Sequence, residues 1–265
     1  MNLRFPFIKN PPLVSVVRLT GMIGTGGRST LNDAALAPLL ERAFRRGKPA
    51  AVALEINSPG GSPVQSSLIA ARIRRLSDET KVPVYAFVED LAASGGYWLA
   101  VAADEIWADA SSIVGSIGVI SSGFGAHVLL ARQGVERRVY TAGESKSMLD
   151  PFRPENPEDV ARLRVILDDL HENFIAHVKS RRGAKLNGEA DLFTGEIWAA
   201  QRATALGLID GIGHLKPRMQ EQFGKKVQFR RYAMRRPVWS RFGAQMAQDA
   251  LFGIEERAAF ARFGL

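Results

Sequence analysis

The chain has 265 residues, of which 46% are hydrophobic and 23% are charged, a composition typical of globular proteins and not of disordered ones. It contains no cysteine, which excludes disulfides, cysteine-based zinc sites, iron–sulfur clusters and a thiol nucleophile. The formal net charge is +8, yet nine basic residues and one acidic residue lie between Lys216 and Arg241. Because the excess is confined to this segment, the charge does not indicate a nucleic-acid-binding protein.

The chain has no stretch of 18 or more apolar residues, so we expect no membrane-spanning helix. The first nine residues lack the long apolar core of a secretory signal. The simplest expectation is a cytoplasmic protein, with peripheral contact to the inner membrane left open by the basic segment.

In the first 140 residues, runs rich in β-branched side chains alternate with helical patterns. Strands are predicted at Val14–Leu19, Ala50–Ile56, Val82–Val88, Glu105–Ala108, Ile117–Ile120 and Glu136–Tyr140. Helices are predicted at Asn32–Arg46, Pro63–Leu76, Gly95–Ala103 and Gly125–Gln133. Such alternation produces βαβ crossovers, so we expect an α/β fold with a mostly parallel sheet.

The second half of the chain begins with a predicted loop over Gly143–Pro157. An apolar stripe at helical spacing predicts a long helix over Glu158–Arg182, with acids at its start and bases at its end. A helix over Ile197–Leu206, a strand over Lys226–Tyr232 and a helix over Ala244–Phe263 follow. Without a repeat or a linker, we expect residues 1–215 to form the main body and residues 216–265 a basic extension of the same domain.

Three glycine-rich turns follow predicted strands. They are Asn57–Ser62, Asp90–Tyr97 and Gly115–Ile120. Open α/β sheets bind ligands at the carboxyl ends of their strands, so these turns are candidate site segments. Each turn taken alone is equally typical of a structural turn or a helix cap.

A serine nucleophile is one interpretation of Ser94, because the amides of Gly95 and Gly96 could face an oxyanion at a helix start. Such a serine needs a base. The four histidines lie outside the glycine-rich turns, and we expect structural or surface roles for His127, His171, His177 and His214.

Lys146 could serve as the base if the nearby Met148, Leu149 and Phe152 cover it. A lysine accepts a proton only when neutral, so its pKa must fall from about 10.4 by desolvation. On the residues alone, a helix-capping Ser94 and a solvated Lys146 remain the simpler interpretations.

Considered together, these segments resemble a known family. The motifs are Asn57–Ser62, Ala92–Tyr97, Gly115–Val119, Gly143–Met148, Phe193–Gly195 and Ala205–Asp210. In order and spacing they resemble the bacterial signal peptide peptidase A family of serine proteases, over about Val14 to Gly213. The resemblance implies a Clp protease/crotonase-like α/β fold, with repeated β-β-α or βαβ units and a C-terminal helical extension. It also implies cleavage of signal-peptide remnants or other hydrophobic peptides, without a cofactor or a metal.

The family uses a Ser–Lys dyad and an acyl-enzyme. Matched residue by residue, the resemblance implies that Ser94 is the nucleophile, Lys146 the general base and Ser116 a hydrogen-bond partner of that lysine. The oxyanion donors are expected at Gly95 and in the turn of Gly60 and Gly61, with Gly61 favoured. Because some family members are tandem repeats and this chain has one copy, the resemblance implies a ring-like homo-oligomer. In such a ring the nucleophile of one protomer would meet the lysine of its neighbour. Many members also carry an N-terminal membrane anchor, which we do not expect here.

Three other hypotheses stay open. One is a Clp-type protease with a Ser–His–Asp triad, although no histidine has the expected spacing from Ser94. Another is an acyl-CoA enzyme of the crotonase group, which would share the oxyanion hole. The third is a non-catalytic oligomeric scaffold at membranes. The basic segment either attracts anionic lipid, helped by Pro237, Trp239 and Phe242, or is a solvated or subunit-pairing face.

Overall fold

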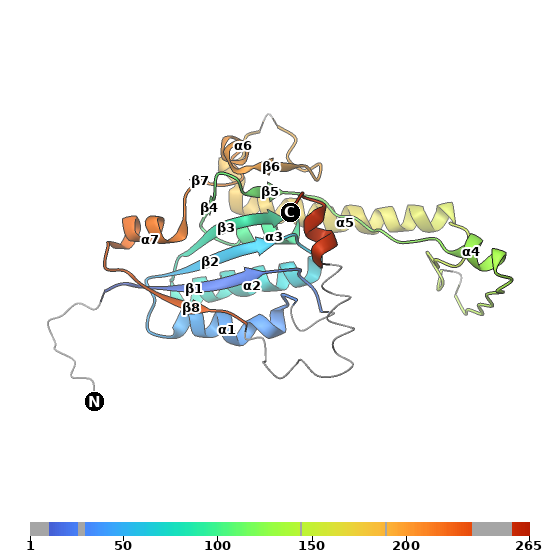
Figure 1. The fold of residues 1–265 in the computed structure, drawn as a ribbon, viewed down its shortest axis with the longest axis horizontal. Helices are drawn as coiled ribbons and strands as arrows, with labels where there is room; N and C mark the ends of the chain where they lie inside the picture. Colours follow the sequence, from blue (N-terminus) through green and yellow to red (C-terminus); the bar gives the residue numbers. More distant parts are fainter. Residues whose placement is uncertain (1–10, 26–29, 144, 189, 235–255) are drawn as a thin grey trace.

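Eight strands form one sheet in the part of the chain that the computed structural model describes, which is residues 11–25, 30–143, 145–188, 190–234 and 256–265. The sheet order is β6-β5-β3-β2-β1-β8, with β4 beside β3 and β7 beside β4 (Figure 1). The strands are β1 Leu13–Thr20, β2 Ala51–Ser58, β3 Val84–Ala93, β4 Glu105–Ala108, β5 Ile113–Gly115, β6 Ile197–Ala199, β7 Gly211–Ile212 and β8 Gln228–Tyr232. Every pair is parallel except β5 with β6, which confirms the predicted mostly parallel α/β fold.

Asparagine side chains cap the starts of two of the main helices. The helices are α1 Asp33–Arg45, α2 Pro63–Thr80, α3 Gly95–Ala100, α4 His127–Arg132, α5 Pro157–Arg182, the 3-10 turn η1 Gly183–Lys185, α6 Ala200–Ala205 and α7 Leu215–Phe223. Residues 256–261 form a further short helix. Asn32 accepts a hydrogen bond from the Ala35 amide at 2.9 Å, and Asn156 accepts one from the Glu158 amide at 3.0 Å. These side chains satisfy amides that have no partner inside the helix.

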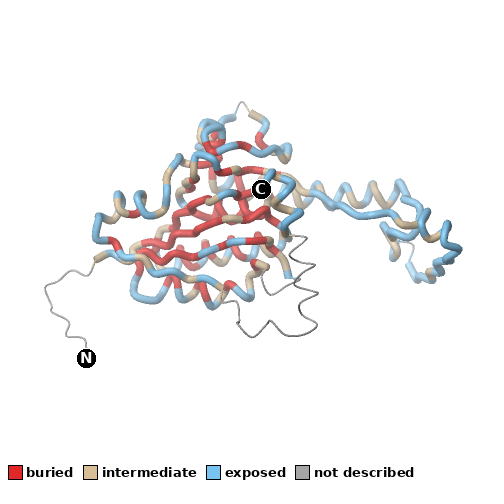
Figure 2. Tube along the Cα trace, viewed as in Figure 1, coloured by how far each residue is buried: buried red, intermediate tan, exposed pale blue. Residues whose placement is uncertain are grey.

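Alternate residues of the central strands supply two apolar layers. Val17 and Leu19 of β1 belong to the larger core, together with α1, α2, α3 and the end of α5. Val14 and Val16 point to the opposite face, where a smaller cluster includes Met219 of α7. Figure 2 shows this buried region concentrated in the sheet and the adjoining helices. Because β2 and β3 are buried on both faces, their carboxyl ends are rigid supports for the turns that follow.

A long arm projects from this body. Figure 1 shows α5 extending away from the sheet, with α4 and the segment between α4 and α5 at its far end. None of the described residues from 121 to 173 is buried (Figure 2). Large apolar side chains on the arm are open to solvent, including Phe124 at 94% exposure and Tyr140 at 90%. In α5 only Phe174, Val178 and Arg182, near its carboxyl end, are buried.

Four predicted elements differ from the structure. The strand predicted at residues 136–140 is wrong: this segment lies exposed on the arm, where it has no sheet to join. Residues 117–120 do not pair in the sheet, and the strand lies earlier, at β5. The helix predicted from residue 197 splits into β6 and α6, and the helix from residue 95 ends at Ala100. Of the helix predicted over 244–263, residues 244–255 lie outside the described part.

The basic segment packs partly against the body. Arg218 of α7 lies 3.8 Å from the Trp107 ring centroid, and Arg231 of β8 bonds Glu55 at 2.8 Å. Strand β8 pairs with β1, so this segment extends the main sheet. Arg235, Arg236, Pro237, Trp239, Arg241 and Phe242 lie outside the described residues. Among the residues that are described, no helix has both the length and the apolar character needed to cross a bilayer.

Candidate active site

Ser94 lies at the sharp turn between β3 and α3. Its backbone has φ 51° and ψ −121°, a conformation that side-chain-bearing residues rarely adopt. Two hydrogen bonds hold the turn, from the Ser94 amide to the Gly115 carbonyl at 2.8 Å and from the Trp98 amide to the Ser94 carbonyl at 3.0 Å. The Ser94 side chain makes no capping hydrogen bond to α3. The hydroxyl is therefore free for another role, unlike that of a helix-capping serine.

The turn of Gly60 and Gly61 lies directly against the first residues of α3. Both glycines have positive φ, 98° and 142° respectively. A Cβ at Gly60 would lie 2.7 Å from the Gly95 amide nitrogen, and one at Gly61 would overlap the Ile23 carbonyl. Only glycine permits this close approach of three backbone segments.

Two backbone amides at this junction have no acceptor among the described residues. The Gly60 amide donates to the Ser58 hydroxyl at 3.2 Å, so it is already used. The amides of Gly61 and Gly95 donate to no described group, and the first amide of a helix has no partner within it. Gly61 and Gly95 can therefore supply a pair of donors to a ligand oxygen.

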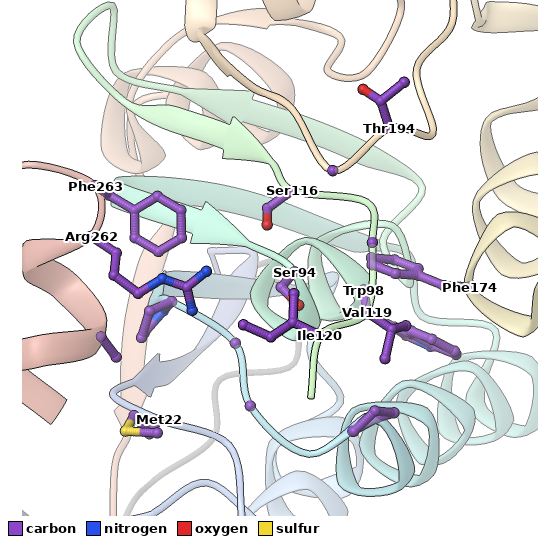
Figure 3. Close-up of a pocket in the computed structure, with 18 residues that line it drawn as sticks. Met22, Ser94, Trp98, Ser116, Val119, Ile120, Phe174, Thr194, Arg262 and Phe263 are labelled. Atoms are coloured by element: carbon purple, nitrogen blue, oxygen red, sulfur yellow. The ribbon is translucent and has the colours of Figure 1, made fainter. Parts of the chain in front are cut away.

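A cavity of about 350 Å³ joins these parts (Figure 3). Ser94, Ser116, Gly60, Gly61 and Gly95 all line it, so the structure gathers five of the six predicted site residues in one place. Ser116 has a positive φ of 53°, and its amide donates to the Glu196 carbonyl at 2.7 Å. Most of the other lining side chains are apolar, and they include Met22, Trp98, Val119, Ile120 and Phe174.

Lys146 is the predicted site residue that the structure does not bring to the cavity. It lies exposed on the arm, in the segment between α4 and α5. Two of the three side chains expected to shield it are themselves open, with Leu149 and Phe152 each 39% exposed, while Met148 is half-buried. Among the described residues, the cavity is lined by no lysine, histidine or carboxylate. Among the described residues of one copy, Ser94 therefore has no base beside it.

The histidines of α5 have structural contacts. His171 and His177 donate from Nε2 to the carbonyls of Ile117 at 3.0 Å and Trp98 at 3.1 Å. His177 also stacks on Trp98, with ring centroids 5.1 Å apart, and burial lowers its pKa. These contacts fasten α5 to the segments that follow Ser94 and Ser116. None of the described cavity-lining residues is a histidine, which counts against a Ser–His–Asp triad.

The residues that form the walls of the cavity were not identified from the sequence. Trp98 and Phe174 stack with ring centroids 4.7 Å apart and form one wall. Another is formed by Ala259 of the C-terminal helix and by Arg262 and Phe263, which follow that helix. These residues come from distant parts of the chain and carry no local motif. The apolar stripe of α5, which contains Phe174, was the one available signal.

Comparison with known proteins gives a family match and several similar chains. The sequence profile of peptidase family S49 matches residues 77–226. The chain is 47% identical over 271 residues to a Brucella abortus protein named Na(+)/H(+) antiporter NhaA, covering 95% of this chain and 37% of that protein. It is 30% identical over 203 residues to the chloroplastic serine protease SPPA of Arabidopsis thaliana, covering 76% of this chain and 29% of that protein. The chain thus spans about a third of the length of these relatives.

A solved structure shares the fold. It is a mutant form of a membrane-bound stomatin-specific protease in complex with a substrate peptide. The TM-score is 0.55 at 15% identity, covering 92% of this chain and 98% of that one. This similarity confirms the predicted Clp-protease-like architecture.

Proposed function

Because the chain belongs to peptidase family S49, we propose that it is a serine endopeptidase in which Ser94 is the nucleophile. The observation that carries this proposal is the shared cavity of Ser94, Ser116 and the two unpaired amides of Gly61 and Gly95. The apolar walls favour hydrophobic peptides, such as remnants of signal peptides, as substrates.

The reaction proceeds through an acyl-enzyme. Ser94 Oγ bonds the scissile carbonyl carbon while its proton passes to Lys146 Nζ. The Gly61 and Gly95 amides donate to the resulting oxyanion, and loss of one such donor in other enzymes costs about 10²–10³ in rate. The lysine then returns the proton to the leaving amine as the C–N bond breaks. Water hydrolyses the ester by the same route, and the Ser116 hydroxyl orients the lysine through a hydrogen bond.

The base comes from a neighbouring copy of the chain. Three observations support this part of the proposal. The described cavity residues include no lysine. Lys146 lies on an arm that no described residue of its own copy covers, and the arm exposes Phe124, Tyr140 and Val165, the last at 61%. A second copy packed on the arm would bury these side chains and bring the lysine amine into apolar surroundings, where an uncharged amine is favoured.

Labelling with a serine-directed phosphonate and cleavage of an apolar peptide test the proposal. The wild type should be labelled and active. Ser94→Ala should lose both properties, and Lys146→Ala should be folded but inactive. Lys225→Ala removes an exposed lysine away from the cavity and serves as the matched control, with wild-type behaviour expected. Full cleavage activity in Ser94→Ala would refute the proposal.

A further inference from the structure

We propose that Arg262 is a specificity-determining residue that binds a carboxylate of the peptide substrate. This inference rests on the proposed peptidase function and names a substrate class that apolar walls alone do not suggest. The cavity is lined by 18 described residues, and Arg262 is the only charged one among them. A cation thus stands in the same cavity as Ser94, with no acidic side chain among these lining residues to neutralise it.

The guanidinium reaches the cavity from outside the main body. Figure 3 shows the side chain of Arg262, the residue that follows the C-terminal helix, extending into the space lined by Ser94, Ile120 and Phe263. Its amide donates to the Ala258 carbonyl at 3.3 Å, which ties the backbone of Arg262 to the end of the helix. The side chain makes no ion pair or hydrogen bond with any group of the described residues. Its donors are therefore available to a ligand.

Many other arginines of the described chain are engaged. Arg72 bonds both oxygens of Asp33 at 2.6 Å, and Arg182 bonds Asp210 at 2.7 Å. The absence of a partner at Arg262 among the described residues coincides with a position on the substrate cavity. A guanidinium matches the two oxygens of a carboxylate in a bidentate geometry, and such charge-assisted pairs are about twice as strong as neutral hydrogen bonds.

The charge of Arg262 also acts on basic peptides. Arg262 is exposed to solvent, so water screens its interactions and only charged groups held in contact with it are discriminated. A lysine or arginine of a peptide placed beside Arg262 would be repelled, which adds discrimination against basic sequences. The carboxylate can come from an Asp or Glu side chain near the scissile bond or from the C-terminus of a short peptide. Both sources present the same group to the guanidinium.

Paired peptides separate these sources. One apolar sequence is made with Glu or Gln at each position from three residues before to three residues after the scissile bond. Each peptide is made with a free C-terminal carboxylate and with a carboxamide. The wild type should cleave one acidic form with kcat/KM about 10-fold above that of its neutral partner, which corresponds to about 1.4 kcal/mol. A Glu-dependent gain identifies a side-chain carboxylate, and an acid-over-amide gain identifies a C-terminal one.

Three variants complete the test. Arg262→Gln should reduce the acidic-to-neutral ratio to about 1, mainly through KM, and Arg262→Lys should keep part of it. Arg257→Gln removes an exposed arginine of the helix that precedes Arg262; it does not line the cavity, so this variant should keep the wild-type ratio. A ratio near 1 in the wild type, or an unchanged ratio in Arg262→Gln, would overturn the inference alone. So would an equal rise in the cleavage of acidic and neutral peptides by Arg262→Gln, because Arg262 would then only obstruct the cavity. Failure of the wild type to cleave any peptide would refute the proposed peptidase as well.

Discussion

The backbone conformation of Ser94 leads to a prediction in which the cost of backbone strain can be measured separately from the loss of the hydroxyl. At φ 51° and ψ −121° a serine is strained, whereas glycine adopts this conformation freely. Ser94→Gly and Ser94→Ala both remove the hydroxyl, but only glycine relieves the strain. A sparsely populated backbone conformation costs about 1–3 kcal/mol. Glycine loses about 0.5–1 kcal/mol more conformational entropy on folding than alanine. The glycine variant should therefore be the more stable by about 0.5–2 kcal/mol, or a few degrees in Tm.

Urea unfolding of the two variants measures this difference. The matched control is the pair Ser67→Gly and Ser67→Ala at an exposed position inside α2. There the glycine variant should be the less stable by about 0.5–1 kcal/mol, because the helix gives glycine no advantage. If Ser94→Gly proved less stable than Ser94→Ala, by the margin seen at Ser67, the strained turn would not exist in solution.

Three further outcomes are expected from buried groups. Burial lowers the pKa of His177 from 6.5, so its contribution to stability is complete above about pH 6.5 and is lost as the pH falls below that value. In urea midpoints measured from pH 7.5 to 5, His177→Gln should show a smaller decline than the wild type. Phe174→Ala should lower the free energy of unfolding by about 3–5 kcal/mol, since Phe174 is 2% exposed. The control Phe152→Ala should lower it by less than about 1 kcal/mol, because Phe152 is 39% exposed. Arg182→Ala should cost about 1–3 kcal/mol, because it removes the buried ion pair with Asp210 and the hydrogen bonds to the Gly207 carbonyl, while Lys185 still pairs with Asp210 at 2.6 Å. Adding Asp210→Asn should recover part of the loss.

The strands of the core could be predicted from the sequence because burial dictated their composition. Most residues of β1, β2 and β3 are buried and are β-branched or small, and their predicted bounds lie close to the observed ones at the strand starts. The segment from Glu136 to Tyr140 ends in Val139 and Tyr140, which favour strands, but it lies exposed on the arm. No neighbouring strand is available to it among the described residues of one copy. Tertiary context therefore overrode local preference.

Some residues of the candidate site could also be predicted from the sequence, and others could not. Ser94, Ser116 and the glycine turns follow buried strands, so their meeting at one edge of the sheet follows from parallel topology. Phe174 and Arg262 reach the cavity from other parts of the chain, and no short motif marks them. Lys146 could be selected only by resemblance, because the contact proposed for it requires a second copy.

Subunit mixing tests the central claim most directly, namely that Ser94 and Lys146 from neighbouring copies form one site. Ser94→Ala and Lys146→Ala, each inactive alone, are co-expressed with different tags and purified as mixed assemblies. Random pairing places an intact serine beside an intact lysine at about one quarter of the junctions of a closed ring, so about a quarter of the wild-type peptidase activity should return. Mixed assemblies that remain as inactive as either variant alone would contradict the account.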